Sequence, residues 1–280
     1  MSVKNAESGM QEHEIDPAMP WAHRLGLIVL QTDETIEQDF RAFTSDPSIA
    51  LYHTRIPSSP TVTTDTLRQM ENHIPSAASL LLKEPPLAVI GYGCTSASTV
   101  LGEARVRDLV QSEHPGVPVT NPLTALKAAL AALGVSRLGL VSPYIRSVTD
   151  ALEAELAKSG TPFVRAAVFG REEENLVARI APSSILSAAE KVAGDPEVEA
   201  VFASCTNLRA SAVIADAERL TGKPFLCSNQ VLAWHMLRLA GIDRTVPQLG
   251  RLGSLGLARG DAVLEKRDFV ACQQPGSVNQ

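Results

Sequence analysis

The sequence predicts an α/β protein with two similar lobes, each containing a parallel β-sheet flanked by helices. Short apolar segments alternate with Ala-, Leu- and Glu-rich segments along the chain, which is typical of parallel sheets covered by helices. Hydrophobic residues make up 45% of the 280 residues and aromatic residues only 4%, so the core is expected to be aliphatic, as in parallel α/β layers. Arg-Leu-Gly-Leu occurs at 24–27 and again at 137–140, which indicates an internal repeat.

The first half of the chain contains four expected strands and four expected helices. Apolar positions three and four apart distinguish the helices from the short apolar runs of the strands. Pro122 and Gly134 bound one helix in the usual order, with proline in its first turn and glycine at its end. We expect strands over 25–30, 49–56, 87–93 and 118–120, and helices over 35–44, 63–82, 97–113 and 122–134.

The second half begins with the repeated segment and continues the same alternation. We expect strands over 137–143, 162–170 and 198–204, and helices over 147–160, 185–194 and 208–222, with 224–230 and 231–241 completing the set. No segment after a strand reads GxGxxG, and no P-loop is present, so a nucleotide cofactor is not expected.

Composition narrows the classes of partner. The formal charge is −6 without a long Lys/Arg cluster, so neither nucleic acid nor an anionic membrane is an expected partner. Residues 1–21 and the last residues have the composition of flexible tails. The N-terminus lacks the signal-peptide pattern, and no apolar run approaches the roughly 18 residues of a membrane helix, so we expect a cytoplasmic protein. Its four cysteines should then be thiols, and without CxxC pairs no metal is expected.

Two matched segments, GYGCTSAS (91–98) and FASCTNLR (202–209), contain the candidate active-site cysteines. Cys94 and Cys205 each follow a strand and precede Thr, and their spacing of 111 residues nearly equals the 113 of the repeat. Ligands of parallel sheets bind at the carboxyl ends of strands, and a helix N-terminus stabilises a thiolate. Neighbouring donors are expected to hold a substrate carboxylate: Thr95, Ser96, Thr206 and Asn207.

Two thiols on opposite sides of a cleft between the lobes fit acid–base chemistry at carbon. One thiolate removes a proton from carbon or adds to it, and the other thiol delivers a proton to the other face, without a metal or organic cofactor. The alternative is that a cysteine at the end of a buried strand simply packs in the core. The matched pair favours function, and we expect Cys94 or Cys205 to react first with iodoacetamide. Cys227 and Cys272 lack this setting and are predicted to be structural.

At these residues the sequence resembles the aspartate/glutamate racemase superfamily, most closely the branch that holds maleate cis-trans isomerase and arylmalonate decarboxylase. The resemblance spans residues 22–245 and is strongest at four segments, 25–37, 91–98, 141–149 and 202–209. It implies two flavodoxin-like lobes, 22–119 plus 228–275 and 120–227, with the active site between them. It also implies that Tyr144 donates a hydrogen bond to substrate. In maleate isomerases the first cysteine is the nucleophile and the second the proton source, which correspond to Cys94 and Cys205.

One departure from the maleate isomerases concerns the substrate. They resemble PSSNTTME where this chain reads LQTDETIE, so Asp33 replaces a substrate-binding Asn. A carboxylate there suits a cationic or N–H-bearing substrate; the equal alternative is that Asp33 caps the helix 35–44. The stretch is similar to the isomerase-like protein of ectoine and hydroxyectoine utilisation clusters, whose substrate class combines a carboxylate with a cationic ring.

His53 and Arg55, at the end of the second strand, are further candidates for the site. Arg55 could bind a carboxylate bidentately, with a surface charge as the equal alternative. Trp234 and His235 are expected to pack within a helix.

The function predicted from these residues is a cofactor-independent isomerase or racemase that uses two opposed cysteines on a small carboxylate substrate. A maleate isomerase-like reaction, with ectoine or hydroxyectoine catabolism as the finer option, is the first interpretation. The alternatives are an amino-acid or hydantoin racemase and a non-enzymatic small-molecule binding protein on the same scaffold. The partners expected are the small-molecule carboxylate and, as an open alternative, further copies of the chain.

Overall fold

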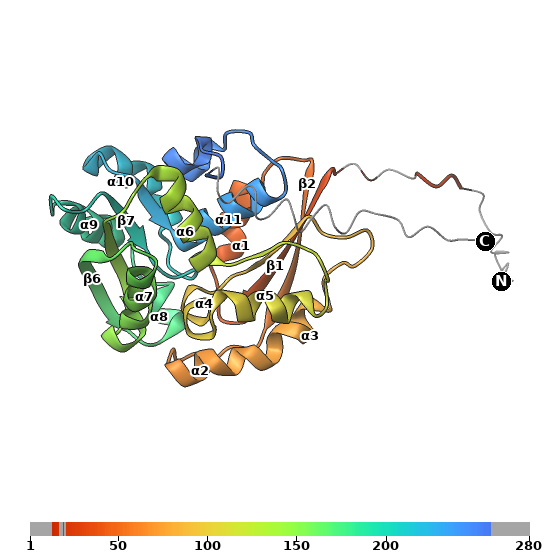
Figure 1. Ribbon diagram of the computed structural model, residues 1–280, viewed down its shortest axis with the longest axis horizontal. Coiled ribbons are helices and arrows are strands. Elements are labelled where there is room, and N and C mark those ends of the chain that lie inside the picture. The colour runs from red at the N-terminus through yellow and green to blue at the C-terminus, as the bar shows by residue number, and fades with distance from the viewer. Residues whose placement is uncertain (1–12, 17–18, 20, 259–280) are drawn as a thin grey trace, which may run out of the picture.

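The computed structural model describes residues 13–16, 19 and 21–258, and Cys272 therefore lies outside the described residues. Two four-stranded parallel sheets form the framework, with strand orders β2-β1-β3-β4 and β6-β5-β7-β8 (Figure 1). The strands of the first are β1 (His23–Leu30), β2 (Ile49–Ile56), β3 (Val89–Tyr92) and β4 (Val119–Thr120). Those of the second are β5 (Leu138–Tyr144), β6 (Phe163–Arg171), β7 (Ala200–Ala203) and β8 (Phe225–Cys227).

The two sheets repeat one topology, as the internal sequence repeat predicts. The repeated Arg-Leu-Gly-Leu segments lead into β1 and β5, each of which pairs with a strand on either side. Leu25, Leu27, Leu138 and Leu140 are completely buried, because an inner strand of a parallel sheet is covered by helices on both faces. The predicted fold of two α/β lobes is therefore confirmed.

Helices cover both sheets. Those of the first half are α1 (Ile36–Phe43), α2 (Thr64–Gln69), η1 (Met70–His73), α3 (Ile74–Ala78), α4 (Thr95–Leu101), α5 (Glu103–Gln111) and α6 (Pro122–Leu133). Those of the second half are α7 (Arg146–Lys158), α8 (Glu174–Val177), α9 (Pro182–Ala193), η2 (Ser211–Val213), α10 (Ile214–Thr221), α11 (Ser228–Leu239) and η3 (Pro247–Ser254). The capping predicted for 122–134 is present, since Asn121 caps α6 and Gly134 ends it in the left-handed conformation.

Three expected helices differ from the structure. The segment 63–82 is broken into α2, η1 and α3, with Pro75 in the first turn of α3. The segment 97–113 is two helices, because Gly102 adopts a φ of +89° between α4 and α5. The helix expected over 208–222 begins only at Ile214, after a 3₁₀ turn. Cys205 therefore does not open a helix directly, unlike Cys94.

Helices α6 and α11 each follow the last strand of a sheet and pack against each other (Figure 1). Helix α11 also contacts α1 and β3 of the first sheet, and its side chains are buried along nearly its whole length. The lobe boundaries 22–119 plus 228–275 and 120–227 stay a prediction, and residues 259–275 lie outside the described part.

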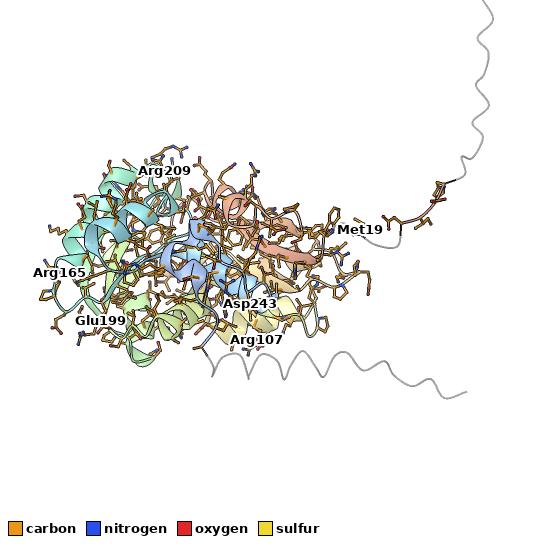
Figure 2. All side chains as sticks on the ribbon, turned by 90° about the horizontal axis from the view of Figure 1, so that it is seen from above. Met19, Arg107, Arg165, Glu199, Arg209 and Asp243 are labelled. Carbon is orange, nitrogen blue, oxygen red and sulfur yellow. The ribbon has the colours of Figure 1, made fainter. Side chains whose placement is uncertain are left out.

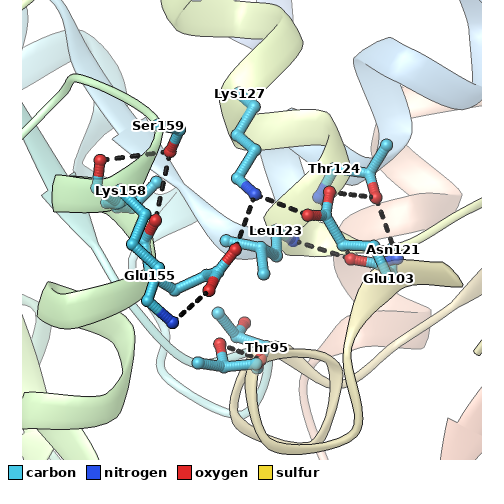
Figure 3. A network of polar contacts seen from close by, with 11 residues as sticks. Thr95, Glu103, Asn121, Leu123, Thr124, Lys127, Glu155, Lys158 and Ser159 are labelled. Atoms are coloured by element: carbon cyan, nitrogen blue, oxygen red, sulfur yellow. Dashed lines mark hydrogen bonds and ion pairs between the residues drawn. The ribbon is translucent and has the colours of Figure 1, made fainter. Parts of the chain in front are cut away.

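A charged cluster joins helices of the two halves (Figure 3). The Lys127 ammonium on α6 donates to Glu103 of α5 at 2.5 Å and to Glu155 of α7 at 3.1 Å. All three side chains are about one-quarter to one-third exposed. The cluster therefore connects α5 and α6 of the first half to α7 of the second half.

The outer surface carries the charged side chains, such as Arg107, Arg165 and Arg209 (Figure 2). Among the described residues, no helix is both long and apolar enough to cross a membrane.

Candidate active site

The carboxyl ends of strands from both sheets meet at one place. Asp33 follows β1, Cys94 follows β3, Tyr144 ends β5, and Cys205 lies two residues beyond β7. All four are buried, with exposed fractions of 3–5%. Hydrogen bonds join the loops of the two sheets directly, since Thr206 Oγ1 donates to the carbonyl of Gly93 at 3.3 Å. The site therefore lies between the two sheets, where ligands of parallel α/β proteins bind.

Cys94 occupies the N-cap of α4. Its sulfur accepts a hydrogen bond from the backbone N–H of Ala97 at 3.3 Å. Burial raises the pKa of the Cys94 thiol to about 12; the Ala97 hydrogen bond lowers it, and the negative charges of Glu174 and Asp33 each add a smaller increase. The helix N-terminus does not outweigh burial, so the expected stabilised thiolate is not the resting state.

Cys205 has an unusual backbone. Its φ of +109° is the only positive φ of a non-glycine residue in the described part of the chain, a conformation that costs about 1–3 kcal/mol. Its Sγ accepts the backbone N–H of Asn207 at 3.3 Å and lies 3.0 Å from Tyr144 Oη. Burial, followed by the charge of Glu174, raises the pKa of the Cys205 thiol. Both cysteines are therefore neutral thiols.

A chain of hydrogen bonds leads from Cys205 into the protein. Tyr144 Oη donates to Glu174 Oε1 at 2.6 Å, so its oxygen is left to accept from the Cys205 thiol. Asn207 Nδ2 donates to Glu174 Oε2 at 3.0 Å. Burial raises the pKa of Glu174, against the lowering effect of these two donors. Glu174 is thus a buried carboxylate at the centre of the site.

Sequence reasoning missed Glu174. It is the third of three consecutive glutamates after β6 and opens the short helix α8. Its backbone N–H donates to the carbonyl of Pro60 at 3.0 Å, which fastens this loop to the other half of the protein. The signal that was available is its position just beyond the carboxyl end of a parallel strand, the same rule that identified the cysteines.

Ser228, the first residue of α11, was also missed. Its Oγ accepts a hydrogen bond from Thr95 Oγ1 at 2.8 Å and another from the backbone N–H of Cys205 at 2.9 Å. Ser228 is completely buried. One hydroxyl thus holds the loops of both cysteines, and it too directly follows a strand.

Asp33 makes the contacts expected of a helix cap, one of its two predicted roles. Its Oδ1 accepts the backbone N–H groups of Thr35 and Ile36, both at 2.8 Å, so it caps the start of α1. Its Oδ2 is buried and makes no hydrogen bond; the neighbouring Thr206 hydroxyl donates to Gly93 instead. Burial raises the pKa of Asp33. Capping is therefore present, and substrate binding by Asp33 stays a prediction.

The four side chains expected to bind a carboxylate are all at the site, but most are engaged within the protein. The Thr95 hydroxyl donates to Ser228, the Thr206 hydroxyl to Gly93, and the Asn207 amide to Glu174. Ser96 is half-buried beside Cys94 and makes no side-chain hydrogen bond in the described part of the chain. Backbone N–H groups and Ser96 are thus the donors left for a substrate carboxylate, and the binding roles stay predictions.

Arg55 has a different environment. Its Nη1 donates to the backbone carbonyls of Leu30, Gln31 and Asp33 at 3.0–3.2 Å, and its Nη2 lies 2.9 Å from Glu37. The guanidinium therefore supports the loop that carries Asp33 from outside. His53, on the same strand, is exposed.

Contrary to the prediction, Cys227 also lies between the end of a strand and the start of a helix. It ends β8, and its backbone N–H donates to Gln230 at the start of α11. Its charged neighbour is Asp39, whereas Asp33 and Glu174 are the neighbours of the other two cysteines. Cys227 is therefore a strand-end cysteine outside the site. Cys94, Cys205 and Cys227 are all free thiols.

Trp234 and His235 are buried on α11. The Trp234 indole donates to the carbonyl of Leu255 at 2.9 Å. The His235 ring lies 2.7 Å from Thr120 Oγ1, and burial lowers its pKa to about 4, so it is a neutral core histidine.

A model of the arylmalonate decarboxylase family matches residues 55–253, which is more than two-thirds of the chain. The match includes the loops of Cys94, Tyr144 and Cys205 but not that of Asp33. The chain belongs to the arylmalonate decarboxylase family. A family member, arylmalonate decarboxylase of Bordetella bronchiseptica, is 29% identical over 61% of this chain and 73% of its own length. Maleate isomerase of Nocardia farcinica is 26% identical over 82% of this chain and 94% of its own length.

Solved structures agree with the family fold. Maleate cis-trans isomerase of Nocardia farcinica, in a variant with a covalently bound succinylcysteine intermediate, superposes with a TM-score of 0.73 at 26% identity, covering 82% of this chain and 97% of that one. Maleate isomerase of Pseudomonas putida has a TM-score of 0.76 at 22% identity, covering 83% and 98%. Maleate isomerases are thus among the relatives of this chain, and the chain is an enzyme of the isomerase type.

Proposed function

We propose that this enzyme is a cofactor-independent isomerase or racemase in which Cys94 and Cys205 act from opposite sides on a small carboxylate substrate. The observation that carries the proposal is the Ser228 hydroxyl, which accepts hydrogen bonds from the loops of both cysteines at 2.8 and 2.9 Å. A single group that holds both loops gives the two thiols a fixed relation within one site. Two positioned thiols are sufficient for acid–base chemistry at carbon.

In a cis-trans isomerisation, the Cys94 thiol first loses its proton to solvent, and the thiolate adds to one carbon of a conjugated double bond; the proton returns to Cys94 after the product has left. The π electrons move to the carbon next to the carboxylate, and that carbon takes the proton of the Cys205 thiol. Rotation about the new single bond precedes the reverse steps, in which the Cys205 thiolate removes the proton and the C–S bond breaks to release Cys94. Every bond to the enzyme is restored, so no oxidant or reductant is needed.

In a racemisation, the same pair works without a covalent bond. The Cys94 thiolate removes the proton from the carbon next to the carboxylate, and the Cys205 thiol protonates the opposite face. The reverse direction exchanges the two roles.

Tyr144 supports Cys205 in either reaction. Its hydroxyl lies 3.0 Å from Cys205 Sγ and donates to Glu174 at 2.6 Å. When the Cys205 thiol gives up its proton, the Tyr144 hydroxyl turns from Glu174 to donate to the new thiolate, which stabilises its charge. The Nocardia relative contains a succinylcysteine intermediate, which supports covalent addition as the first of the two routes.

The finer proposal concerns the substrate. The LQTDETIE segment (30–37) supports a role in ectoine or hydroxyectoine catabolism, because Asp33 stands there. The alternative within the enzyme class is an amino-acid or hydantoin racemase, which the matched thiol pair supports equally. A cytoplasmic location is part of the proposal, since free thiols persist in reducing compartments.

The test is proton NMR in D₂O with maleate, both aspartate enantiomers, a substituted hydantoin, ectoine and hydroxyectoine. We expect isomerisation or deuterium exchange of one of these compounds, with losses of about 10²–10⁴-fold in Cys94→Ala and in Cys205→Ala. Cys227→Ala is the matched control, because Cys227 is an equally buried strand-end cysteine outside the site; its rate should stay near wild type.

Loss of turnover in only one of the two variants would contradict the two-thiol mechanism and indicate that a single thiol carries the chemistry. No change in any compound would reject these substrates and favour a binding role for the scaffold.

A further inference from the structure

Glu174 lies at the end of a short chain of hydrogen bonds that begins at Cys205. Cys205 Sγ lies 3.0 Å from Tyr144 Oη, and Tyr144 Oη donates to Glu174 Oε1 at 2.6 Å. All three side chains are 5% exposed, so water competes little for these contacts. An ionised carboxylate can only accept hydrogen bonds, and the one hydrogen of the Tyr144 hydroxyl is therefore committed to Glu174.

The direction of this chain decides what Tyr144 offers to Cys205. Because its hydrogen points at Glu174, Tyr144 faces the sulfur with an oxygen lone pair, which accepts the S–H group and disfavours a thiolate. The sulfur of Cys94 differs, since it receives hydrogen bonds from the backbone N–H groups of Ser96 and Ala97 and from no side chain in the described part of the chain. Only Cys205 is thus held in its protonated form by a neighbouring side chain.

Asn207 fixes how the carboxylate of Glu174 is used. Its Oδ1 accepts the backbone N–H of Glu34 at 2.9 Å, so its Nδ2 is turned toward Glu174 and donates to Oε2 at 3.0 Å. A donor on that side requires an acceptor opposite it. An amide in place of the Glu174 carboxylate would therefore turn its oxygen to Asn207 and its NH₂ group to Tyr144, which reverses the hydrogen bond to Tyr144.

The titratable groups around Glu174 are Tyr144, the two cysteines and Asp33. Burial and the negative charge of Asp33 raise the pKa of Glu174, against the lowering effect of its two donors. Within the described residues, no Lys, Arg or His side chain bonds to Glu174. Its own charge raises the pKa of Cys205, second only to burial, and also that of Cys94. The carboxylate thus acts on Cys205 both through its charge and through Tyr144.

We propose that Glu174 is a positioning residue that assigns the acid role to Cys205: its carboxylate binds the hydrogen of Tyr144, and the oxygen of Tyr144 then keeps the Cys205 thiol protonated. This inference rests on the proposed function, in which Cys205 supplies a proton to carbon. The thiolate left after that step is a strong base, because Glu174 disfavours it. A strong base is what the reverse step needs when it removes the proton again.

Labelling of Cys205 by iodoacetamide in the full chain tests this role, with mass spectrometry of the labelled peptides as the readout. In Glu174→Gln the negative charge is absent and Tyr144 donates to the sulfur, so the pKa of Cys205 should fall. We expect Cys205 to react about tenfold faster or more than in the wild type at neutral pH, as for a pKa lower by about one unit. Its rate should also stop rising at a lower pH, and Cys94 should gain less.

A second background separates the hydrogen bond from the charge. In Tyr144→Phe no hydroxyl remains whose direction could reverse, so the addition of Glu174→Gln removes only the charge. We expect the gain in Cys205 labelling to be smaller there by about threefold or more, because the two side chains act as a pair.

Two controls exclude a loosened site. Glu34→Gln removes a neighbouring carboxylate that is 46% exposed and paired with Arg179, and Cys205 should react in it at the wild-type rate. Cys227 is 2% exposed and has Asp39 as its charged neighbour, so its labelling should be equally slow in every variant. Thermal unfolding checks that each variant folds. A parallel rise at Cys227 would attribute the gain to opening of the structure and overturn the proposal.

An unchanged or slower Cys205 rate in Glu174→Gln, including no labelling in either protein, would also overturn it. The same holds for an equal gain with and without the Tyr144 hydroxyl, since Glu174 would then act by its charge alone. Labelling needs no substrate, so the test is independent of the reaction. Turnover that requires both cysteines, with an unchanged Cys205 rate in the variant, would keep the two-thiol reaction and reject the role of Glu174. The expected labelling without turnover of any compound would keep that role and reject those substrates.

Discussion

Cys94 and Cys205 are equally buried, each with 5% of its surface exposed, and both lie near the carboxylates of Asp33 and Glu174. This environment favours the neutral thiol, whereas the backbone N–H groups of Ala97 and Asn207 favour the thiolate. Burial has the larger effect on both pKa values, because it removes the thiols from water, and the nearby negative groups also favour the neutral form. At the scale of single residues, the resting enzyme therefore holds two protonated thiols.

The consequence is slow alkylation that depends strongly on pH. With a pKa of about 12, only about one in 10⁴ Cys94 side chains is a thiolate at pH 8. We expect iodoacetamide to label Cys94 about 10³-fold more slowly than free cysteine at that pH, with the rate rising roughly tenfold per pH unit between pH 7 and 10. Mass spectrometry of the labelled peptides measures this rate, and a plateau below pH 8 would instead show a resting thiolate.

At the scale of elements, the start of α11 holds the site together. Ser228, its first residue, accepts from Thr95 at the start of α4 and from the Cys205 backbone, whose φ is +109°. A conformation of that kind persists only when its surroundings hold it in place. Helix α11 itself is anchored by its buried side chains against α1 and α6. The geometry of both cysteines thus depends on one helix terminus.

Ser228→Ala removes the shared acceptor. The variant leaves the Thr95 hydroxyl and the Cys205 N–H buried without a partner, and we expect it to lower the free energy of unfolding by about 1–3 kcal/mol. Because Cys205 loses its support, kcat should fall more than substrate affinity. Chemical denaturation and steady-state kinetics measure the two effects. Ser136→Ala, which removes an exposed hydroxyl bonded to Glu199, should leave both values within error; an equal loss there would reject a special role for Ser228.

At the scale of the whole molecule, Asp39 connects α1 to segments of the second half. Its two oxygens accept from Ser211 at 2.5 Å and from Asn229 at 2.7 Å. Burial raises the pKa of Asp39 to about 6 from its ordinary 3.8, against the lowering effect of these donors. The native state therefore binds a proton at Asp39 more tightly than the unfolded chain does.

This difference makes stability fall as pH rises through the window between about 4 and 6. The shift of about two pKa units corresponds to at most about 3 kcal/mol above pH 6. We expect the difference in melting temperature between Asp39→Asn and wild type to move in favour of the variant from pH 4 to pH 6 and to level off above it. Asp65→Asn, on an exposed side chain of α2, should show a constant difference; a constant difference for Asp39→Asn would contradict the shifted pKa.

Much of this architecture is readable from sequence because its signals are local and periodic. The apolar runs of β1 and β5, the Pro122 start and Gly134 end of α6, and the two cysteine segments all appear within short windows. The breaks at Gly102 and after Cys205 were not foreseen, since glycine is tolerated within a helical pattern and a turn after a strand resembles the start of a helix. Glu174 lay in an acidic run that reads as a solvated surface.

Two α/β lobes and two strand-end cysteines could be predicted before folding was considered, because alternation of apolar segments and an internal repeat are properties of the linear chain. Only the tertiary structure decided which groups surround those cysteines. Asn207 meets Glu34 across 173 positions, and Ser228 meets Thr95 across 133. Such contacts follow from how two sheets face each other, and no local pattern records them. The protonation state of the two thiols likewise depends on the tertiary structure, because burial and the approach of Asp33 and Glu174 exist only in the folded chain.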